Sequence, residues 1–109
     1  MDVTATVYIL RCKDGSYYTG ITERPVEARV WEHNHQVADG YTSRRTPVEL
    51  VWCESFARII DAIVMERRIK GWSRAKKEAL IARDYERLRV LAKNRQGSAG
   101  DPRGSTGSP

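Results

Sequence analysis

Five side chains of this chain belong to types that together suit the hydrolysis of a phosphodiester with one metal ion. A phenol or imidazole can move a proton, a guanidinium can neutralise a phosphate, and a carboxylate can hold a hard cation. Two of them lie in short β-branched segments, two follow at helical i, i+4 spacing, and the last lies within an apolar segment. In chain order they are Tyr8, Tyr18, Arg29, His33 and Glu66.

The turn between the two tyrosines decides whether they can act together. A two-residue turn at Asp14-Gly15 would place Tyr8 and Tyr18 on opposite faces of a hairpin. A three-residue loop, residues 13–15 with Gly15 in a left-handed conformation, pairs Cys12 with Ser16, Leu10 with Tyr18 and Tyr8 with Gly20. The sequence allows either register, and a shared catalytic site requires the second. Taken singly, each tyrosine is equally consistent with a packing role.

Arg29 and His33 lie on a helix that is predicted to begin near Pro25 and to end near Asn34 or Gln36. Both flank an apolar stripe of Val26, Val30 and Val37, so we expect them at the edge of the buried face. There they could grip one phosphate. The alternative is an arginine that covers the core with its stem, beside a half-exposed histidine.

Glu66 is predicted on a later helix among Ile59, Ala62, Ile63 and Ile69. A carboxylate in an apolar stripe is costly unless a partner compensates its charge. A neighbouring arginine is one possible partner. The other is Mg²⁺ or Mn²⁺, since magnesium commonly takes one or two carboxylates and fills its shell with water and substrate phosphate.

The elements that position these residues follow from propensity and turn signals. We predict strands over residues 4–12, 16–22 and 49–54, a loop over 37–47, and helices over 57–70, 73–83 and 85–95. Ser55 is expected to cap the first of these helices, and the second is expected to start at Ser73. The order β-β-α-β-α-α indicates an α+β fold, a small three-stranded antiparallel sheet flanked by helices. Residues 1–96 form one domain, and residues 97–109 are expected to be a disordered tail whose removal changes little.

The composition indicates an ordinary globular protein without a membrane span or signal peptide, which favours the cytoplasm. Cys12 and Cys53 are expected to be free, buried small residues. Charge is uneven, because residues 61–96 hold 11 Lys/Arg against 5 Asp/Glu whereas residues 1–60 hold 7 against 8. Such clustering suits a polyanion, although a solvated helix surface would look the same.

At this point the chain resembles the GIY-YIG nuclease superfamily, in particular its small single-domain bacterial members. The similarity covers about residues 4–82. It rests on Val7-Tyr8-Ile9, Tyr18-Thr19-Gly20, Arg29 with His33-Asn34, Glu66, residues 42–47 and residues 66–77. Val7 and Thr19 replace the glycine and isoleucine of the two name-giving motifs, but both tyrosines and Gly20 are kept.

The resemblance implies a Mg²⁺- or Mn²⁺-dependent endonuclease acting on nucleic acid. Tyr8 would activate water, Tyr18 would orient the water or the phosphate, and Glu66 would hold the metal. Arg29 and His33 would neutralise the phosphate. Because an unperturbed phenol has a pKa near ~10, Tyr8 would need positive charge beside it, and Arg29 is the candidate.

No base-reading motif is present, so we expect DNA to be recognised by shape through its phosphates. The residues expected to bind nucleic acid are Arg44, Arg45, Lys70, Arg74, Lys76 and Lys77. Two alternatives remain. The chain could be a non-catalytic nucleic-acid-binding module, or a nuclease subunit that needs a partner protein. Trp72 would then dock the partner, although a Trp that closes the core is the commoner case.

Overall fold

Three antiparallel strands carry the candidate residues. The computed structural model describes residues 3–35 and 41–97, and its sheet has the order β2-β1-β3. The strands are β1 (Ala5–Arg11), β2 (Tyr17–Thr22) and β3 (Glu49–Phe56). Because β1 is the central strand, all of its residues except Arg11 are buried. The predicted α+β class and antiparallel sheet are confirmed.

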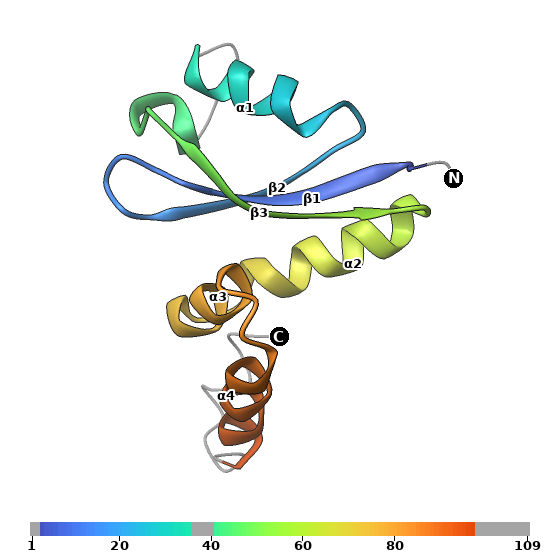
Figure 1. Cartoon of the computed structure of the whole chain (residues 1–109), viewed down its shortest axis with the longest axis vertical. Coiled ribbons are helices and arrows are strands. Elements are labelled where there is room, and N and C mark those ends of the chain that lie inside the picture. The colour runs from blue at the N-terminus through green and yellow to red at the C-terminus, as the bar shows by residue number, and fades with distance from the viewer. Residues whose placement is uncertain (1–2, 36–40, 98–109) are drawn as a thin grey trace. The chain divides into compact units, whose positions relative to one another are not determined.

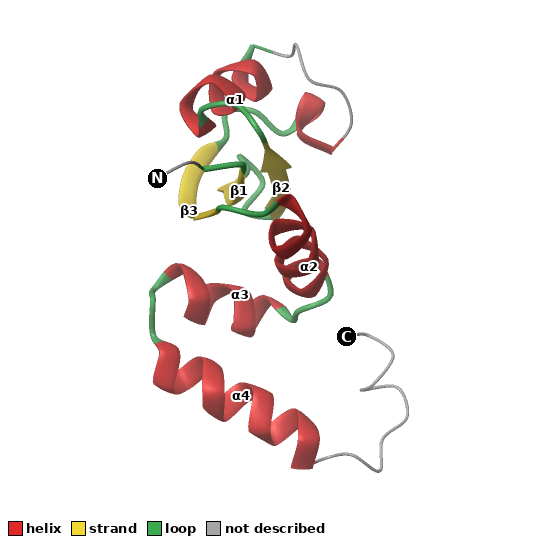
Figure 2. Cartoon of the chain, turned by 90° about the vertical axis from the view of Figure 1, so that its right-hand side faces the viewer, coloured by secondary structure: helices red, strands yellow, loops and turns green. Residues whose placement is uncertain are grey.

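Helices lie on both faces of this sheet. α1 (Val26–Asn34) covers one face, and the first turns of α2 (Ile59–Lys70) lie against the other (Figure 1). A short 3-10 helix, η1 (Tyr41–Arg44), precedes β3. Figure 2 shows the same arrangement from the side. Since side chains alternate along a strand, each residue of β1 faces either α1 or α2.

The face beneath α1 forms a compact apolar cluster. Its buried members are Tyr8, Leu10, Cys12 and Val48, and partly buried side chains packed against them include Tyr18, Val26 and Val30. Cys12 and Cys53 are free, as predicted, but only Cys12 is buried, whereas Cys53 is half-buried. Burial of one strand face against one helix therefore places two tyrosines inside the core beside α1.

The chain divides into two compact units, Met1–Glu66 and Arg67–Pro109. The boundary falls within α2, so Glu66 belongs to the unit that contains the sheet. The second unit contains the end of α2, α3 (Arg74–Ile81) and α4 (Tyr85–Gly97). In it, α3 starts directly after Ser73, which caps the helix because its side chain accepts a hydrogen bond from the backbone N–H of Lys76.

Two predictions between α1 and α2 are wrong. Tyr41–Arg44 forms a 3-10 turn rather than irregular loop, closed by a hydrogen bond from Arg45 N–H to the carbonyl of Thr42. Ser55 does not cap α2. It lies in β3 opposite Thr6, with the two hydroxyl oxygens 3.1 Å apart. Continued pairing with β1 extends β3 to Phe56 and delays the start of α2 to Ile59.

The remaining boundaries agree closely with expectation. α1 ends at Asn34, and the predicted helical character after Tyr85 is a separate helix, α4. Gln36, Val37 and the start of the predicted loop lie outside the described residues, as does the predicted tail from residue 98 on. Within the described ranges, no helix is long and apolar enough to cross a membrane.

Candidate active site

The hairpin register places both tyrosines on the α1 face of the sheet. Gly15 has a φ of 86°, and Cys12 N–H donates to the carbonyl of Ser16 at 2.8 Å, as a three-residue loop requires. Tyr8 then pairs with Gly20 and Leu10 with Tyr18. The ring centres of Tyr8 and Tyr18 are 6.3 Å apart. The second of the two registers left open by the sequence is therefore confirmed.

Gly20 provides the space that the two phenol rings occupy. A Cβ atom at this position would lie 2.5 Å from the Tyr8 hydroxyl oxygen and 2.9 Å from Cε2 of Tyr18. Both distances are shorter than any normal van der Waals contact, so any larger residue would push the Tyr8 ring aside. The site thus depends on glycine at this strand position for space rather than for backbone freedom.

His33 reaches the Tyr8 hydroxyl from α1. Its Nε2 lies 3.1 Å from the Tyr8 oxygen, and its Nδ1 lies 2.6 Å from Oγ1 of Thr42 on η1. Its ring centre is also 5.2 Å from that of Tyr18. His33 is only 1% exposed, so the prediction that it lies at the edge of the buried face is wrong. With both ring nitrogens engaged inside the protein, it is poorly placed to bind a phosphate.

Burial also sets the protonation of this pair. Desolvation raises the pKa of Tyr8 to about 12, and this effect outweighs the lowering by the nearby guanidinium of Arg29. We expected positive charge to activate Tyr8. Arg29 acts in that direction but does not prevail. Desolvation, together with the Arg29 charge, lowers the pKa of His33, so its imidazole is neutral near pH 7.

Arg29 belongs to an ion-pair cluster that the sequence did not reveal. Its Nη1 donates to Oε1 of Glu32 at 2.9 Å, and Nη2 of Arg24 donates to the same oxygen at 2.8 Å. The guanidinium groups of Arg24, which has the larger effect, and of Arg29 lower the pKa of the Glu32 carboxyl to about 2. The i, i+3 spacing of Arg29 and Glu32 was a usable signal. The contact of Arg24, from the β2–α1 turn, with Glu32 could not be predicted from the sequence.

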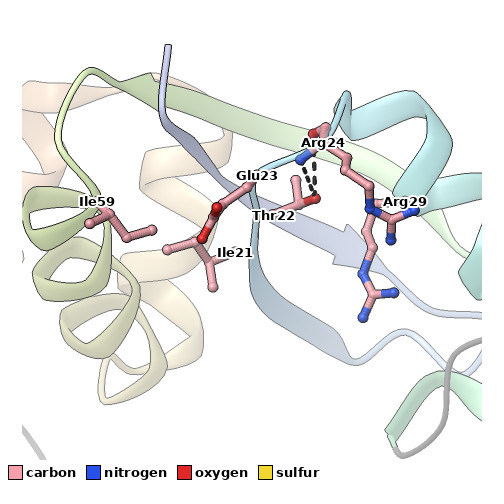
Figure 3. Close-up of a pocket in the computed structure, with 6 residues that line it drawn as sticks. All are labelled: Ile21, Thr22, Glu23, Arg24, Arg29 and Ile59. Atoms are coloured by element: carbon pink, nitrogen blue, oxygen red, sulfur yellow. Dashed lines mark hydrogen bonds between the residues drawn. The ribbon is translucent and has the colours of Figure 1, made fainter.

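A pocket of about 370 Å³ opens beside this cluster, at the edge of the sheet formed by β2 (Figure 3). Residues of β2, the β2–α1 turn, α1 and α2 line it: Ile21, Thr22, Glu23, Arg24, Arg29 and Ile59. Thr22 fixes the approach of Arg24, because its hydroxyl accepts a hydrogen bond from Arg24 N–H at 3.1 Å. The pocket therefore joins the α1 side of the sheet, through Arg29, to the start of α2.

Glu66 lies on α2 and is half-buried, less enclosed than the apolar stripe suggested. It is seven residues beyond Ile59, which is two helical turns and about 10 Å along the axis, so both residues share one face of α2. Ile59 lines the pocket that contains Arg29. Of the five predicted residues, the structure places Tyr18, Arg29 and His33 around Tyr8. Glu66 is not among the residues that line the pocket.

The residues predicted to bind nucleic acid are divided between the two units. In the first, Arg44 is exposed, and Nε of Arg45 lies 3.0 Å from Oδ2 of Asp14. In the second, Lys70 is exposed and Arg74 pairs with Glu78 at 3.0 Å.

Lys76 and Lys77 lie farther from water than expected. Lys76 is 8% exposed, with Nζ 4.6 Å from the ring centre of half-buried Trp72. Burial, helped by the charge of Arg74, lowers the pKa of Lys77. The ammonium of Lys76 is therefore less available to a ligand than the sequence suggested.

Comparison with known proteins finds related sequences and a similar fold. The family model of the GIY-YIG catalytic domain matches residues 4–79. A UPF0213 protein of Halobacterium salinarum is 51% identical over 75 residues, covering 69% of this chain and 96% of that protein. A UPF0213 protein of Staphylococcus saprophyticus is 43% identical over 76 residues, covering 70% and 92%. An NMR structure of an E. faecalis protein matches with 33% identity and a TM-score of 0.53, covering 78% of this chain and 88% of that one.

Proposed function

Because this chain belongs to the GIY-YIG family, we propose that it is a divalent-metal-dependent endonuclease that hydrolyses DNA phosphodiesters by recognising DNA shape. Family membership confirms the resemblance seen in the sequence and indicates a nuclease-type hydrolase. The observation that carries the proposal for this chain is the buried hydrogen bond between Tyr8 and His33, with Tyr18 and Arg29 beside it. A phenol, a neutral base and a guanidinium in one cluster can serve the attack of water on a phosphate.

The proton chemistry begins from a neutral phenol. Since the pKa of Tyr8 is raised to about 12, free phenolate is scarce near neutral pH and the proton needs a base in direct contact. Neutral His33 offers Nε2 at 3.1 Å. As the water oxygen attacks phosphorus, Tyr8 takes a proton from that water and passes its own proton to His33. The bond from phosphorus to the leaving sugar oxygen breaks, and solvent protonates that oxygen.

In this scheme, Arg29 controls the access of the substrate to the Tyr8 hydroxyl. Tyr8 is 1% exposed, whereas the Arg29 side chain is 28% exposed and contacts both Tyr8 and Glu32. A substrate phosphate can compete with the Glu32 carboxylate for the guanidinium donors. Movement of Arg29 onto the phosphate would open the approach to the Tyr8 hydroxyl, with half-buried Tyr18 to orient the incoming group.

Glu66 is the residue that we assign to the metal. No group of three or more His, Cys, Asp or Glu side chains suited to a metal occurs in residues 3–35 and 41–97. A site of one carboxylate, water and substrate phosphate is the kind that Mg²⁺ accepts, and half-buried Glu66, on the same face of α2 as Ile59, is our candidate for that carboxylate. When bound, the metal would stabilise the developing negative charge on the phosphate and the leaving oxygen.

A panel of labelled DNA structures tests the proposal. Duplex, nicked, flapped and branched DNA are incubated with the chain in Mg²⁺, Mn²⁺ or EDTA, beside the variant Glu66→Ala. We expect metal-dependent cleavage of at least one structured DNA by the natural chain and none by the variant. Salt-dependent binding with no cleavage of any substrate would favour a binding module. Cleavage that appears only when another protein is added would favour a nuclease subunit.

A further inference from the structure

Thr42 is the third member of a buried series of hydrogen-bonded side chains that also includes Tyr8 and His33. It is 0% exposed, and its Oγ1 lies 2.6 Å from His33 Nδ1, while Nε2 of the same ring lies 3.1 Å from the Tyr8 oxygen. Thr42 approaches from η1, nine residues beyond His33 and outside α1. Because neither spacing nor periodicity links the two residues, no sequence pattern indicates this hydrogen bond.

The backbone around Thr42 is held on both sides of the turn. Its carbonyl accepts a hydrogen bond from Arg45 N–H at 3.0 Å, and Lys13 N–H donates to the carbonyl of Arg45 at 2.9 Å. After the turn, the Asn34 side chain bonds to both backbone groups of Val48, at 2.6 Å to N–H and 3.1 Å to the carbonyl. Hydrogen bonds from α1 and the hairpin loop thus anchor the segment that carries Thr42.

The donors and acceptors around the His33 ring favour one direction for each proton. The guanidinium of Arg29, which has only donors, acts on the Tyr8 oxygen and favours the arrangement in which Tyr8 gives its own proton to another partner. That partner is Nε2 of His33, 3.1 Å away, which is then unprotonated. A neutral imidazole carries one proton, so it lies on Nδ1 and is donated to Oγ1 of Thr42.

We propose that Thr42 is a positioning residue that holds His33 in the Nδ1-protonated tautomer and so keeps Nε2 free to accept the proton of Tyr8. The inference deepens the proposed nuclease function and rests on it for its effect on catalysis. In the opposite tautomer, Nε2 carries the proton and cannot serve as the base. When Tyr8 transfers its proton, the imidazolium keeps its hydrogen bond from Nδ1–H to Thr42. The contact between His33 and Thr42 therefore need not rearrange during the transfer.

The tautomer of His33 can be measured directly. The chain has two histidines, and exposed His35 is replaced in the variant His35→Gln, which leaves His33 as the only histidine. In this background, ¹⁵N-histidine labelling and NMR distinguish a protonated from an unprotonated ring nitrogen. Thr42→Val keeps the branched shape but removes the hydroxyl, and Thr42→Ser keeps the hydroxyl. Thermal unfolding of both variants reports whether the fold persists.

We expect a protonated Nδ1 and an unprotonated Nε2 in the background chain and in Thr42→Ser. In Thr42→Val the proton should move wholly or partly to Nε2, and cleavage should slow by roughly a hundredfold, the scale of general-base catalysis. A proton on Nε2 in the background chain would overturn the proposal, even if Thr42→Val does not fold. So would an unchanged tautomer in a folded Thr42→Val variant.

Failure of the nuclease function and failure of the Thr42 role give different results. If no DNA is cleaved under any condition, the nuclease proposal fails while the NMR result still decides whether Thr42 sets the tautomer. If the natural chain cleaves DNA and Thr42→Val changes the tautomer but not the rate, Thr42 orients His33 without a role in catalysis. Restoration of both tautomer and rate by Thr42→Ser supports the positioning role.

Discussion

At the scale of single residues, the side chains of the candidate site differ most in their exposure to solvent. Tyr8 and His33 are each 1% exposed, whereas the Arg29 side chain is 28% exposed. Charged groups are disfavoured by burial, so the inner pair is neutral at rest and suited to proton transfer. The outer guanidinium keeps its charge and is suited to phosphate. Residue types in the sequence predicted the members of this site, but only burial divides their roles.

We predict that Glu66→Gln abolishes cleavage and leaves DNA binding nearly unchanged. The amide keeps the size of the side chain but lacks the negative charge that a hard cation needs, so the rate should fall at least about a hundredfold. Single-turnover cleavage in Mg²⁺ beside a binding titration measures both quantities. Asp61→Asn, an exposed acid on the same helix, is the matched control and should cleave normally. Equal cleavage by Glu66→Gln would remove Glu66 from the mechanism.

Glu32→Gln should tighten DNA binding. Glu32 contacts the guanidinium groups of both Arg24 and Arg29, and a neutral amide would compete less with a phosphate for their donors. We expect a dissociation constant lower by roughly threefold to tenfold, about 0.7 to 1.4 kcal/mol. Glu27→Gln removes the same charge from an exposed position of α1 and controls for long-range repulsion. If both variants tighten binding equally, the contacts of Glu32 are irrelevant.

At the scale of elements, the β1–β2 hairpin determines whether a site exists. Gly15 and the requirement for two phenols on one face indicated the register that the structure contains. The sequence failed where long-range contacts override local signals. Ser55 resembles a helix cap, yet pairing with β1 keeps it in β3. Thr42 lies in a segment without periodicity, and only the folded chain places it against His33.

Gly20→Ala should disrupt the site without unfolding the sheet. The new Cβ would lie 2.6 Å from Cζ and 2.5 Å from the hydroxyl oxygen of Tyr8, and the side chain can move more easily than the strand. We expect disruption of the Tyr8–His33 hydrogen bond and a fall in cleavage rate of at least about tenfold, with β structure retained by circular dichroism. Undiminished activity in Gly20→Ala would show that the close packing of the two phenols is not required.

At the scale of the whole molecule, the excess positive charge and the candidate catalytic residues belong to different units of the chain. Met1–Glu66 contains 7 Lys/Arg and 10 Asp/Glu, whereas Arg67–Pro109 contains 12 and 4. The catalytic candidates all lie in the acidic unit. The excess of positive charge that attracts nucleic acid lies in the helical unit. The sequence predicted this division, since charge counts need no fold, but burial of Lys76 could not be read from them.

The basic unit should set the salt dependence of DNA binding. Replacing Lys70, Arg74 and Lys77 together by glutamine should weaken binding and flatten the plot of log affinity against log salt, by about 0.9 for each phosphate that is no longer neutralised. Cleavage at saturating protein should change little. The triple variant of Arg83, Arg87 and Lys93 removes equal charge beyond the matched residues 4–79 and should have the smaller effect. An unchanged slope in the first variant would place the DNA elsewhere.

The Tyr8 hydroxyl is the group on which the proposed phosphodiester hydrolysis depends most. Its most direct test is single-turnover, Mg²⁺-dependent cleavage of the best DNA substrate by Tyr8→Phe, which keeps the buried ring and removes only the oxygen bonded to His33. Tyr17→Phe, on the opposite face of β2, is the matched control. We predict a rate at least about a hundredfold lower for Tyr8→Phe with DNA binding intact, and a normal rate for Tyr17→Phe. Cleavage by Tyr8→Phe at the rate of the natural chain would contradict this mechanism.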